Sequence, residues 1–239
     1  MGKSALITGA SRGIGRAIAE ALAGEGMDLY LLCHNNIEML DELACRLTER
    51  YSISCHTFCG DVADSEFIDM VFSSIDSLDV LINNAGISHI GLLQDMTNAE
   101  WNKIINTNLS GVFYCCRAAI PLMLSSHSGR IINISSMWGS VGASMEVAYS
   151  TTKGGMNSFT KALAKEIAPS NIVVNAIACG VIDTDMNSCF NDEEMSDLIN
   201  DIPIGRLGKP SEVAQVVLEL ASAPEYMTGQ IIGMDGGYI

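Results

Sequence analysis

Positive charge is scarce in this sequence. Its 239 residues include 13 lysines and arginines against 28 aspartates and glutamates, which gives a formal net charge of −15. Nucleic acids and anionic membranes bind to clustered positive charge, and an acidic protein partner also needs a local basic patch. The composition therefore argues against nucleic-acid and membrane partners and favours small or neutral ligands.

Long apolar runs and organised cysteines are also missing. MGKS leads directly into the apolar ALIT, so no secretion signal is expected, and no apolar run approaches the roughly 18 residues of a membrane span. The cysteines form no C-x-x-C pair and no Cys/His spacing of a zinc site. They lie at positions 33, 45, 55, 59, 115, 116, 179 and 189. We expect a cytoplasmic protein with free thiols and no metal.

The residues that are present predict an α/β fold. Hydrophobic residues make up 48% of the chain and charged residues 17%, as in a sheet covered on both faces. Short apolar runs alternate with helical stretches such as 16–26, which predicts βαβ units and a parallel sheet. The runs lie at 5–8, 28–33, 80–84, 130–135, 172–178 and 230–236. With no dividing linker, residues 1–239 are expected to form one Rossmann-type, doubly wound domain.

A glycine-rich loop, TGASRGIG at 8–15, follows the first predicted strand and opens the first helix. Gly9 permits a tight turn, Gly13 lets the backbone approach a phosphate, and Gly15 lets the helix pack closely on the strand. The spacing differs from G-x-G-x-x-G, and an ordinary βα turn is the alternative. The context favours a dinucleotide site. Its expected loop residues are Gly9, Ser11, Arg12, Gly13, Ile14 and Gly15.

The end of the second predicted strand indicates which dinucleotide binds. NAD sites usually place an acidic residue about 20 residues beyond the loop, where it binds the ribose 2′-hydroxyl. Here the strand ends in Cys33, His34 and Asn35, with no acid, while Arg12 lies in the glycine loop. A cation without a carboxylate suits a 2′-phosphate, so NADP(H) is expected in preference to NAD(H). Alternatively, Arg12 is only a solvated loop residue.

Tyr149 and Lys153 are four residues apart, so on a helix they share a face. A nearby ammonium would favour the phenolate and lower the pKa of the tyrosine. Such a tyrosine would exchange a proton with a carbonyl while a nicotinamide exchanges hydride, and Ser136 would bond the same oxygen. A tyrosine and a lysine at this spacing are also common on ordinary helix surfaces. Spacing alone leaves both interpretations open.

Six motifs together resemble the short-chain dehydrogenase/reductase family over nearly the whole chain. They are TGASRGIG at 8–15, GDV at 60–62, NNAG at 83–86, TNLSG at 107–111, INISS at 132–136 and YSTTK at 149–153. They occur in the family's order and separations, and the ending GQIIGMDGGYI is also similar. The resemblance implies that the protein is an oxidoreductase that interconverts a carbonyl and an alcohol.

The resemblance also implies roles for individual residues. Tyr149 would be the general acid/base, Lys153 would bind the nicotinamide ribose and lower the tyrosine pKa, Ser136 would orient the carbonyl, and Asn108 would hold a water in the proton relay. Further cofactor contacts would come from Asp61, Val62, Asn84, Ala85, Gly86, Gly180, Ile182 and Thr184.

One position departs from the family pattern. Members usually carry Pro-Gly after the sixth strand, and this chain has Cys179 and Gly180. Proline would stiffen that turn, so its absence is expected to loosen the nicotinamide pocket. Cys179 is either redox-sensitive or, as the ordinary alternative, a small buried thiol.

The sequence leaves several substrate classes open. IPIGRLGKPSEVA at 202–214 and the overall pattern resemble reductases of 3-oxoacyl groups on acyl carrier protein, but His127 and Ser170 stand where those enzymes carry carrier-docking arginines. The combination of SHIGLL at 88–93, SSMWGSVGASMEVAYS at 135–150 and NDIPIGRL at 200–207 resembles a branch that reduces an aminopentanone group on elongation factor P. Trp138 and Glu146 could receive its ammonium. The alternative is that they are only a pocket wall and a solvated loop acid. Steroid, sugar or small-ketone reduction and a non-catalytic NADP(H) sensor are further alternatives.

Two expectations concern parts around the site. The acidic segment 183–205 is expected to form a lid, with Met186 beside the substrate, although a surface excursion is the alternative. The family commonly forms tetramers, so a homo-oligomer is expected, with GVFYCCRAAI at 111–120 supplying part of an interface.

Overall fold

A computed structural model of the protein describes residues 2–188 and 190–239 and contains a seven-stranded, wholly parallel sheet. The strand order is β3-β2-β1-β4-β5-β6-β7. The strands are β1 (Ser4–Thr8), β2 (Asp28–Cys33), β3 (Cys55–Cys59), β4 (Val80–Asn83), β5 (Gly129–Ser136), β6 (Ile172–Cys179) and β7 (Ile231–Met234). This is the Rossmann-type, doubly wound sheet that the apolar runs predicted.

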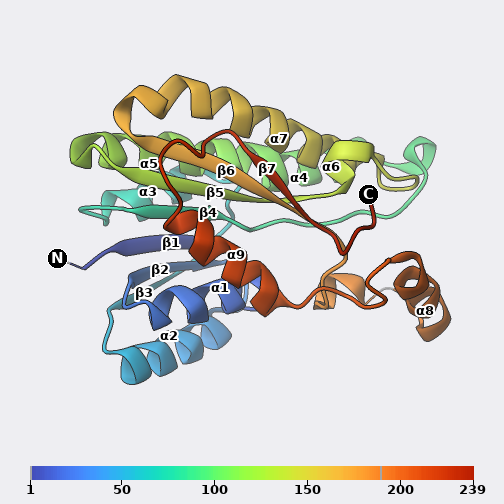
Figure 1. The fold of residues 1–239 in the computed structure, drawn as a ribbon, viewed down its shortest axis with the longest axis horizontal. Coiled ribbons are helices and arrows are strands. Elements are labelled where there is room, and N and C mark those ends of the chain that lie inside the picture. Colours follow the sequence, from blue (N-terminus) through green and yellow to red (C-terminus); the bar gives the residue numbers. More distant parts are fainter. Residues whose placement is uncertain (1, 189) are drawn as a thin grey trace.

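Helices cover both faces of the sheet, with α1, α2 and α9 on one side and α3, α5 and α7 on the other (Figure 1). The α-helices are α1 (Gly13–Gly24), α2 (Ile37–Tyr51), α3 (Ser65–Ser73), α4 (Asn98–Ile105), α5 (Gly111–Ser126), α6 (Trp138–Val141), α7 (Val147–Ile167), α8 (Asp192–Asp201) and α9 (Pro210–Ala221). Short turns of other helix types are η1 (Leu93–Asp95), η2 (Asn106–Ser110), η3 (Ala168–Ser170) and η4 (Asp185–Asn187).

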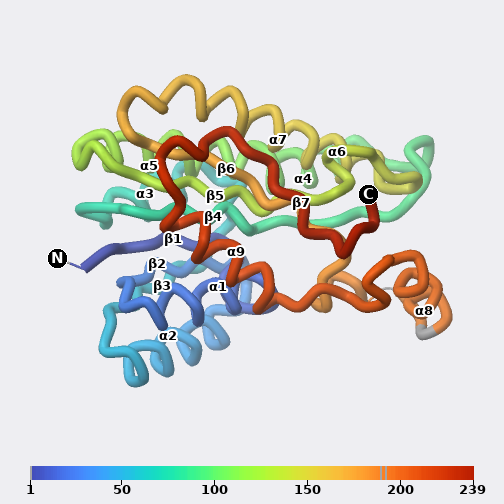
Figure 2. The backbone as a smooth tube through the Cα atoms, viewed as in Figure 1, coloured from blue at the N-terminus to red at the C-terminus, as the bar shows by residue number. Residues whose placement is uncertain are grey.

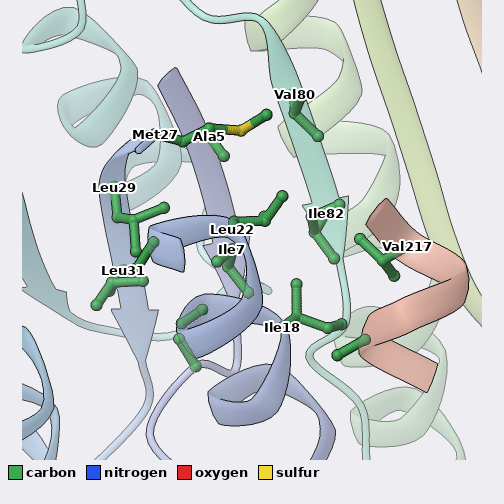
Figure 3. Close-up of a cluster of buried hydrophobic side chains, with 14 of the residues drawn as sticks. Ala5, Ile7, Ile18, Leu22, Met27, Leu29, Leu31, Val80, Ile82 and Val217 are labelled. Atoms are coloured by element: carbon green, nitrogen blue, oxygen red, sulfur yellow. The ribbon is translucent and has the colours of Figure 1, made fainter. Parts of the chain in front are cut away.

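Two cores, one on each face, hold the layers together. On one face, Ile18 and Leu22 of α1 and Val217 of α9 pack against strand residues such as Ile7 and Leu31 (Figure 3). The other face buries α3, α5 and α7 against alternate residues of the same strands. Because neighbouring strand residues point to opposite faces, strands buried on both sides read as unbroken apolar runs.

The strand order places a site at the carboxyl ends of the central strands. The chain builds β1, β2 and β3 outward in one direction and then returns to place β4 on the other side of β1. Ligands of open α/β sheets bind at this switch point, beyond the carboxyl ends of the strands. The continuous tube shows the loops after β1 and β4, α6 and α8 at the same end of the molecule (Figure 2).

The strand predictions are confirmed for six of the seven strands, with ends shifted by a few residues. β3, with the sequence CHTFC, was not predicted. It pairs on one side only, with β2, and three of its residues are partly buried. An edge strand with polar residues lacks the apolar run that identified the others.

The helical stretch Asn98–Ser126 joins α4, η2 and α5 into one long segment. Within the described residues it is the one helix with the length and composition of a membrane span. The sequence predicted no segment of this kind. Its inward residues, including Val112 and Met123, pack in the core beside the sheet, and core helices meet the same criterion. Cys115 and Cys116 also face inward, each 1% exposed. The outward side of 111–120 is therefore formed by other residues, such as Phe113.

All seven cysteines within the described residues are free thiols, and Cys189 lies outside those residues. No group of three or more metal-ligating side chains occurs among the residues the structure describes.

Candidate active site

A cleft of about 730 Å³ opens beyond the carboxyl ends of the strands. Residues from the loops after β1, β2, β3, β4, β5 and β6 line it, as expected at a switch point. All but two of the sequence-predicted site residues belong to this lining, and the exceptions are Gly15 and Asn108. Those in the lining are Gly9, Ser11, Arg12, Gly13, Ile14, His34, Asn35, Asp61, Val62, Asn84, Ala85, Gly86, Ser136, Trp138, Glu146, Tyr149, Lys153, Gly180, Ile182, Thr184 and Met186.

The glycine loop has the geometry that phosphate binding requires. Gly9 and Gly13 have φ values of +67° and +54°, which side chains rarely allow. A Cβ at Gly15 would collide with the carbonyl oxygen of Gly9, so this glycine permits the close approach of α1 to the loop. No side chain caps the first N–H groups of α1. An anionic phosphate is a suitable partner for them, because the helix dipole also favours negative charge there.

Thr8 links the glycine loop to the loop after β4, a role that sequence reasoning missed. Its hydroxyl accepts hydrogen bonds from the backbone N–H groups of Asn84 and Ala85, at 3.0 and 2.9 Å. In the opposite direction, the side chain of Asn84 donates to the carbonyl oxygens of Thr8 and Gly9. The two loops at the switch point are therefore fixed to each other. The sequence motifs could have indicated this link, because Thr8 opens TGASRGIG and Asn84 lies in NNAG.

The adenosine end of the cleft carries Arg12 and the segment after β2. His34 and Asn35 lie in its wall, and His34 Nε2 is 3.8 Å from Asp61 Oδ2. Arg12 forms a salt bridge with Asp185 of the segment 183–205, with Nη1 and Oδ2 3.0 Å apart. The open glycine loop, the uncapped helix start and the nearby guanidinium fit a nicotinamide dinucleotide.

The structure brings Ser136, Tyr149 and Lys153 together. Ser136 ends β5, while Tyr149 and Lys153 project from the same side of α7. The Ser136 hydroxyl is close enough to the Tyr149 hydroxyl to affect the pKa of the phenol. The Lys153 ammonium is 5.6 Å from the centre of the Tyr149 ring and donates a 2.7 Å hydrogen bond to the carbonyl of Ile134. Lys153 is 4% exposed, so it is directed into the site and away from solvent.

Burial shifts the pKa values of Lys153 and Tyr149. Desolvation lowers the pKa of Lys153 to about 8. It also raises the pKa of Tyr149 above its usual range, while the Ser136 hydroxyl opposes the rise. The Lys153 ammonium donates to the Ile134 carbonyl, and its expected lowering of the tyrosine pKa stays a prediction. Tyr149 is consequently a neutral phenol near pH 7, the form that can donate a proton.

Asn108 lies behind the cleft and is completely buried. Its side chain accepts from the backbone N–H of Ile87 and donates to the Ile87 carbonyl, both at 2.8 Å, and also donates to Thr152 on α7. It belongs to the π-helical turn η2, a type of distortion often found at functional sites. The side chain thus joins the loop after β4 to the helix that carries Tyr149. Its role in holding a relay water stays a prediction.

Trp138 and Glu146 form the other wall of the cleft. Glu146 is half-buried, and desolvation raises the pKa of its carboxyl group, while the nearby Trp138 indole opposes the rise. The edge of Trp138 meets the ring of Tyr238, with ring centres 5.6 Å apart. A Cβ at the neighbouring Gly139 would lie 2.6 Å from the Lys153 backbone, so α6 packs closely on α7. This packing holds α6, and with it Trp138, against the helix that carries Tyr149.

The turn at Cys179 and Gly180 is held by contacts that do not need proline. The N–H of Gly180 donates to the carbonyl of Met234, and the Cys179 carbonyl accepts from Met137. A Cβ at Gly180 would lie 2.7 Å from Asp235. Burial raises the pKa of the Cys179 thiol to about 12. The thiol therefore fits the ordinary alternative, a small buried side chain with little thiolate.

The segment 183–205 contributes Thr184, Asp185 and Met186 to the cleft. Thr184 also packs beside the glycine loop, where its methyl group would be 3.3 Å from a Cβ at Gly13. Asp185, Ile134, Thr152 and Tyr238 join Thr8 as residues of this region that sequence reasoning missed. Their contacts are between distant segments, so no local pattern marks them.

Comparisons with known proteins agree with this geometry. The family model for short chain dehydrogenase matches residues 3–195. The chain is 40% identical over 240 residues to the uncharacterized oxidoreductase YmfI of Bacillus subtilis, covering 100% of this chain and 99% of the relative. It is 40% identical over 241 residues to the 3-oxoacyl-[acyl-carrier-protein] reductase FabG of Aquifex aeolicus, covering 99% and 97%.

Among solved structures, YwfH, an NADPH-dependent reductase involved in bacilysin biosynthesis, superposes with a TM-score of 0.94 at 26% identity, covering 100% of this chain and 99% of that one. The family match spans most of the sequence, and the relatives match it from end to end. This chain therefore belongs to the short-chain dehydrogenase family and is an oxidoreductase that binds a nicotinamide cofactor.

Proposed function

We propose that the protein uses NADPH to reduce a ketone to a secondary alcohol. The observation that carries this proposal is the convergence of Ser136, Tyr149 and Lys153 in one cleft with the glycine loop. The reduced nicotinamide, when bound, supplies the hydride. The neutral phenol of Tyr149 donates a proton to the developing alkoxide, and the Ser136 hydroxyl orients the same oxygen.

NADPH is preferred to NADH because of the charges at the adenosine end. Arg12 supplies a guanidinium in the glycine loop, and the end of β2 has His34 and Asn35 where an NAD site carries an acid. Arginine suits the bidentate recognition of phosphate. The name of the structural relative YwfH, an NADPH-dependent reductase, supports the same choice.

For the substrate, the site best supports a ketone that carries a nearby ammonium, such as the aminopentanone group on elongation factor P. Glu146 places a carboxylate in the cleft and contacts the Trp138 indole. It is close enough to Tyr149 for its charge to raise the pKa of the phenol. A partly desolvated carboxylate beside an aromatic ring is a suitable receptor for an alkylammonium.

A 3-oxoacyl group on acyl carrier protein is the second candidate, favoured by relatives of that activity such as FabG. The surface gives this substrate less support. His127 directly follows α5 and Ser170 ends η3, so neither place offers an arginine. Arg130, which lies close to His127 in sequence, donates to the backbone carbonyls of Gly129 and Ala223 and is not free to dock an acidic carrier.

Two structural proposals accompany this function. We propose that 183–205 acts as a lid, because Thr184, Asp185 and Met186 line the cleft above the glycine loop. We also propose a homo-oligomer, with a tetramer favoured by the family resemblance and the exposed Phe113 at one contact surface. A single domain over 1–239 and a cytoplasmic location remain predictions from the sequence.

A comparative rate measurement tests the function and the substrate together. Purified protein is given NADPH with either acetoacetyl carrier protein or aminopentanone-modified elongation factor P, and NADPH oxidation is followed. A higher kcat/KM for the modified elongation factor supports the aminoketone. A higher value for the carrier-bound thioester supports the second candidate. The absence of oxidation with these substrates and with a generic β-ketoester would contradict reductase activity.

A further inference from the structure

Cys33 and Cys59 are directly opposite each other at the carboxyl ends of β2 and β3. They are register partners in the parallel ladder, so their side chains lie on the same face of the sheet, and the Cys59 thiol is close enough to raise the pKa of Cys33. Cys33 is 3% exposed, whereas Cys59 is exposed on the edge strand. Neighbouring strands lie about 4.7–4.9 Å apart, inside the range of about 4.4–6.8 Å between the Cα atoms of disulfide-bonded residues. The usual strand spacing is therefore compatible with a disulfide between these register partners.

The two thiols are bonded to the segment that forms the adenosine end of the cleft. The Cys59 thiol donates to the carbonyl oxygen of His34 at 3.3 Å. The backbone N–H of Asn36 is close enough to the Cys33 sulfur to oppose the rise in the pKa of that thiol. His34, Asn35 and Asn36 all line the cleft, and Asn36 is the residue directly before α2. The positions of the two sulfurs are thus linked to the backbone that would receive the 2′-phosphate ribose.

We infer that Cys33 and Cys59 form a reversible disulfide that weakens NADPH binding when a small disulfide oxidises the protein. The Cys59 thiol would lose the hydrogen that it donates to His34, and both sulfurs would turn toward each other. The segment His34–Asn36 would then lose the hydrogen bond that the Cys59 thiol donates to it. This inference rests on the proposed NADPH site, but formation of the disulfide can be measured without any cofactor.

The chemistry proceeds in two exchange steps. The accessible Cys59 thiolate attacks one sulfur of the small disulfide, forms a mixed disulfide and releases one small thiolate. The Cys33 thiolate then attacks the Cys59 sulfur, which forms the protein disulfide and releases the second small thiolate. The two protein protons end on the released thiolates, so the small disulfide gains two electrons and the protein loses two.

The environment of Cys33 makes the second step the slow one. Burial is the main cause that raises the pKa of Cys33 to about 11, and the adjacent Cys59 thiol adds to the rise. Together they outweigh the opposing effect of the Asn36 backbone N–H. Only a small fraction is thiolate near pH 7, and the thiolate is the nucleophile. Formation of the internal bond should therefore accelerate as the pH rises from 7 to 9.

The experiment treats the reduced protein with oxidised glutathione and follows its mass. The expected product has lost two hydrogens and yields a peptide containing Cys33 bonded to Cys59. The matched control is Cys45→Ser, because Cys45 is an exposed thiol on α2 with no cysteine contact among its interactions. This variant should still form the bond, whereas Cys59→Ser should not. A stable glutathione adduct on Cys59 without the internal bond would contradict the inference.

NADPH binding is then measured by fluorescence titration of the reduced, oxidised and re-reduced protein. Loss of about one hydrogen bond at the adenosine segment should raise the Kd about fivefold in the oxidised form and be reversed by a dithiol reductant. Saturating NADPH should slow formation of the bond. An unchanged Kd with the bond present would overturn the inference. If the reduced protein does not bind NADPH, the proposed function fails instead.

Discussion

Arg12 of the glycine loop and Asp185 of the segment 183–205 form a salt bridge with a 3.0 Å separation between Nη1 and Oδ2. These residues are 173 positions apart in the sequence, and both side chains are more than half exposed. The guanidinium proposed to bind the 2′-phosphate of NADPH is thus already paired with a carboxylate of the proposed lid. The phosphate and Asp185 compete for one cation.

This competition predicts that Asp185→Asn tightens NADPH binding. Exposed salt bridges contribute up to about 1 kcal/mol, so the Kd for NADPH should fall about two- to fivefold while the Kd for NADH stays unchanged. The control is Asp183→Asn, which removes the same charge two residues away without touching Arg12. Fluorescence titration measures both constants. Weaker NADPH binding in Asp185→Asn would mean that the carboxylate positions Arg12 instead of competing with the phosphate.

Replacing Tyr149 by Phe removes the proposed proton donor and keeps the ring. We expect turnover to fall at least about 100-fold, the usual size of a general-acid effect, with NADPH affinity changed less than about twofold. Tyr226→Phe is a suitable control, because this tyrosine is fully exposed. Steady-state rates and NADPH titration distinguish the two effects. Near-normal turnover in Tyr149→Phe would exclude the tyrosine mechanism.

Glu146→Gln should impair only substrates that carry an ammonium. Losing a charged partner costs about 1.5–3 kcal/mol, so KM for the aminoketone should rise roughly tenfold or more. KM for an acetoacetyl thioester should stay within about twofold. Glu225→Gln, outside the cleft lining, controls for the change in net charge. An equal loss with both substrates would indicate that Glu146 supports the wall of the cleft and does not recognise the substrate.

The buried Lys153 predicts a pH-dependent stability. Its folded pKa of about 8 lies below the ordinary lysine value of 10.5, so the unfolded chain binds more protons between these values. Stability contributed by this group therefore rises with pH through that window and is lowest below pH 8. Relative to wild type, Lys153→Met should be more stable at pH 7 than at pH 9.5, with a difference of about 2 kcal/mol between the two conditions.

Chemical denaturation at both pH values measures this change. Lys161→Met on the exposed side of α7 is the control and should show no such dependence. The comparison between pH values cancels the cost of losing the hydrogen bond to Ile134, since that cost is present at both. A difference that does not vary with pH would mean that Lys153 is not desolvated in the free protein.

Local patterns predicted much of this site. TGASRGIG needs glycines at Gly9 and Gly13 because the backbone there has positive φ, and such a requirement is visible in one sequence. The i, i+4 spacing of Tyr149 and Lys153 places them on one face of a helix for the same local reason. β3 escaped prediction because its burial depends on the single strand beside it and on α2, and its own residues are not consistently apolar.

The sequence by itself determined the parallel sheet, the dinucleotide loop and the residues that carry the proposed chemistry, because periodicity and motif spacing act over a few residues. Only the tertiary structure decided the direction of the Tyr149 pKa, the pairing of Arg12 with Asp185 and the contact between Cys33 and Cys59. Desolvation and charge interactions depend on distances between segments that are far apart along the chain. These distances are set when the strands pair and the helices pack upon them.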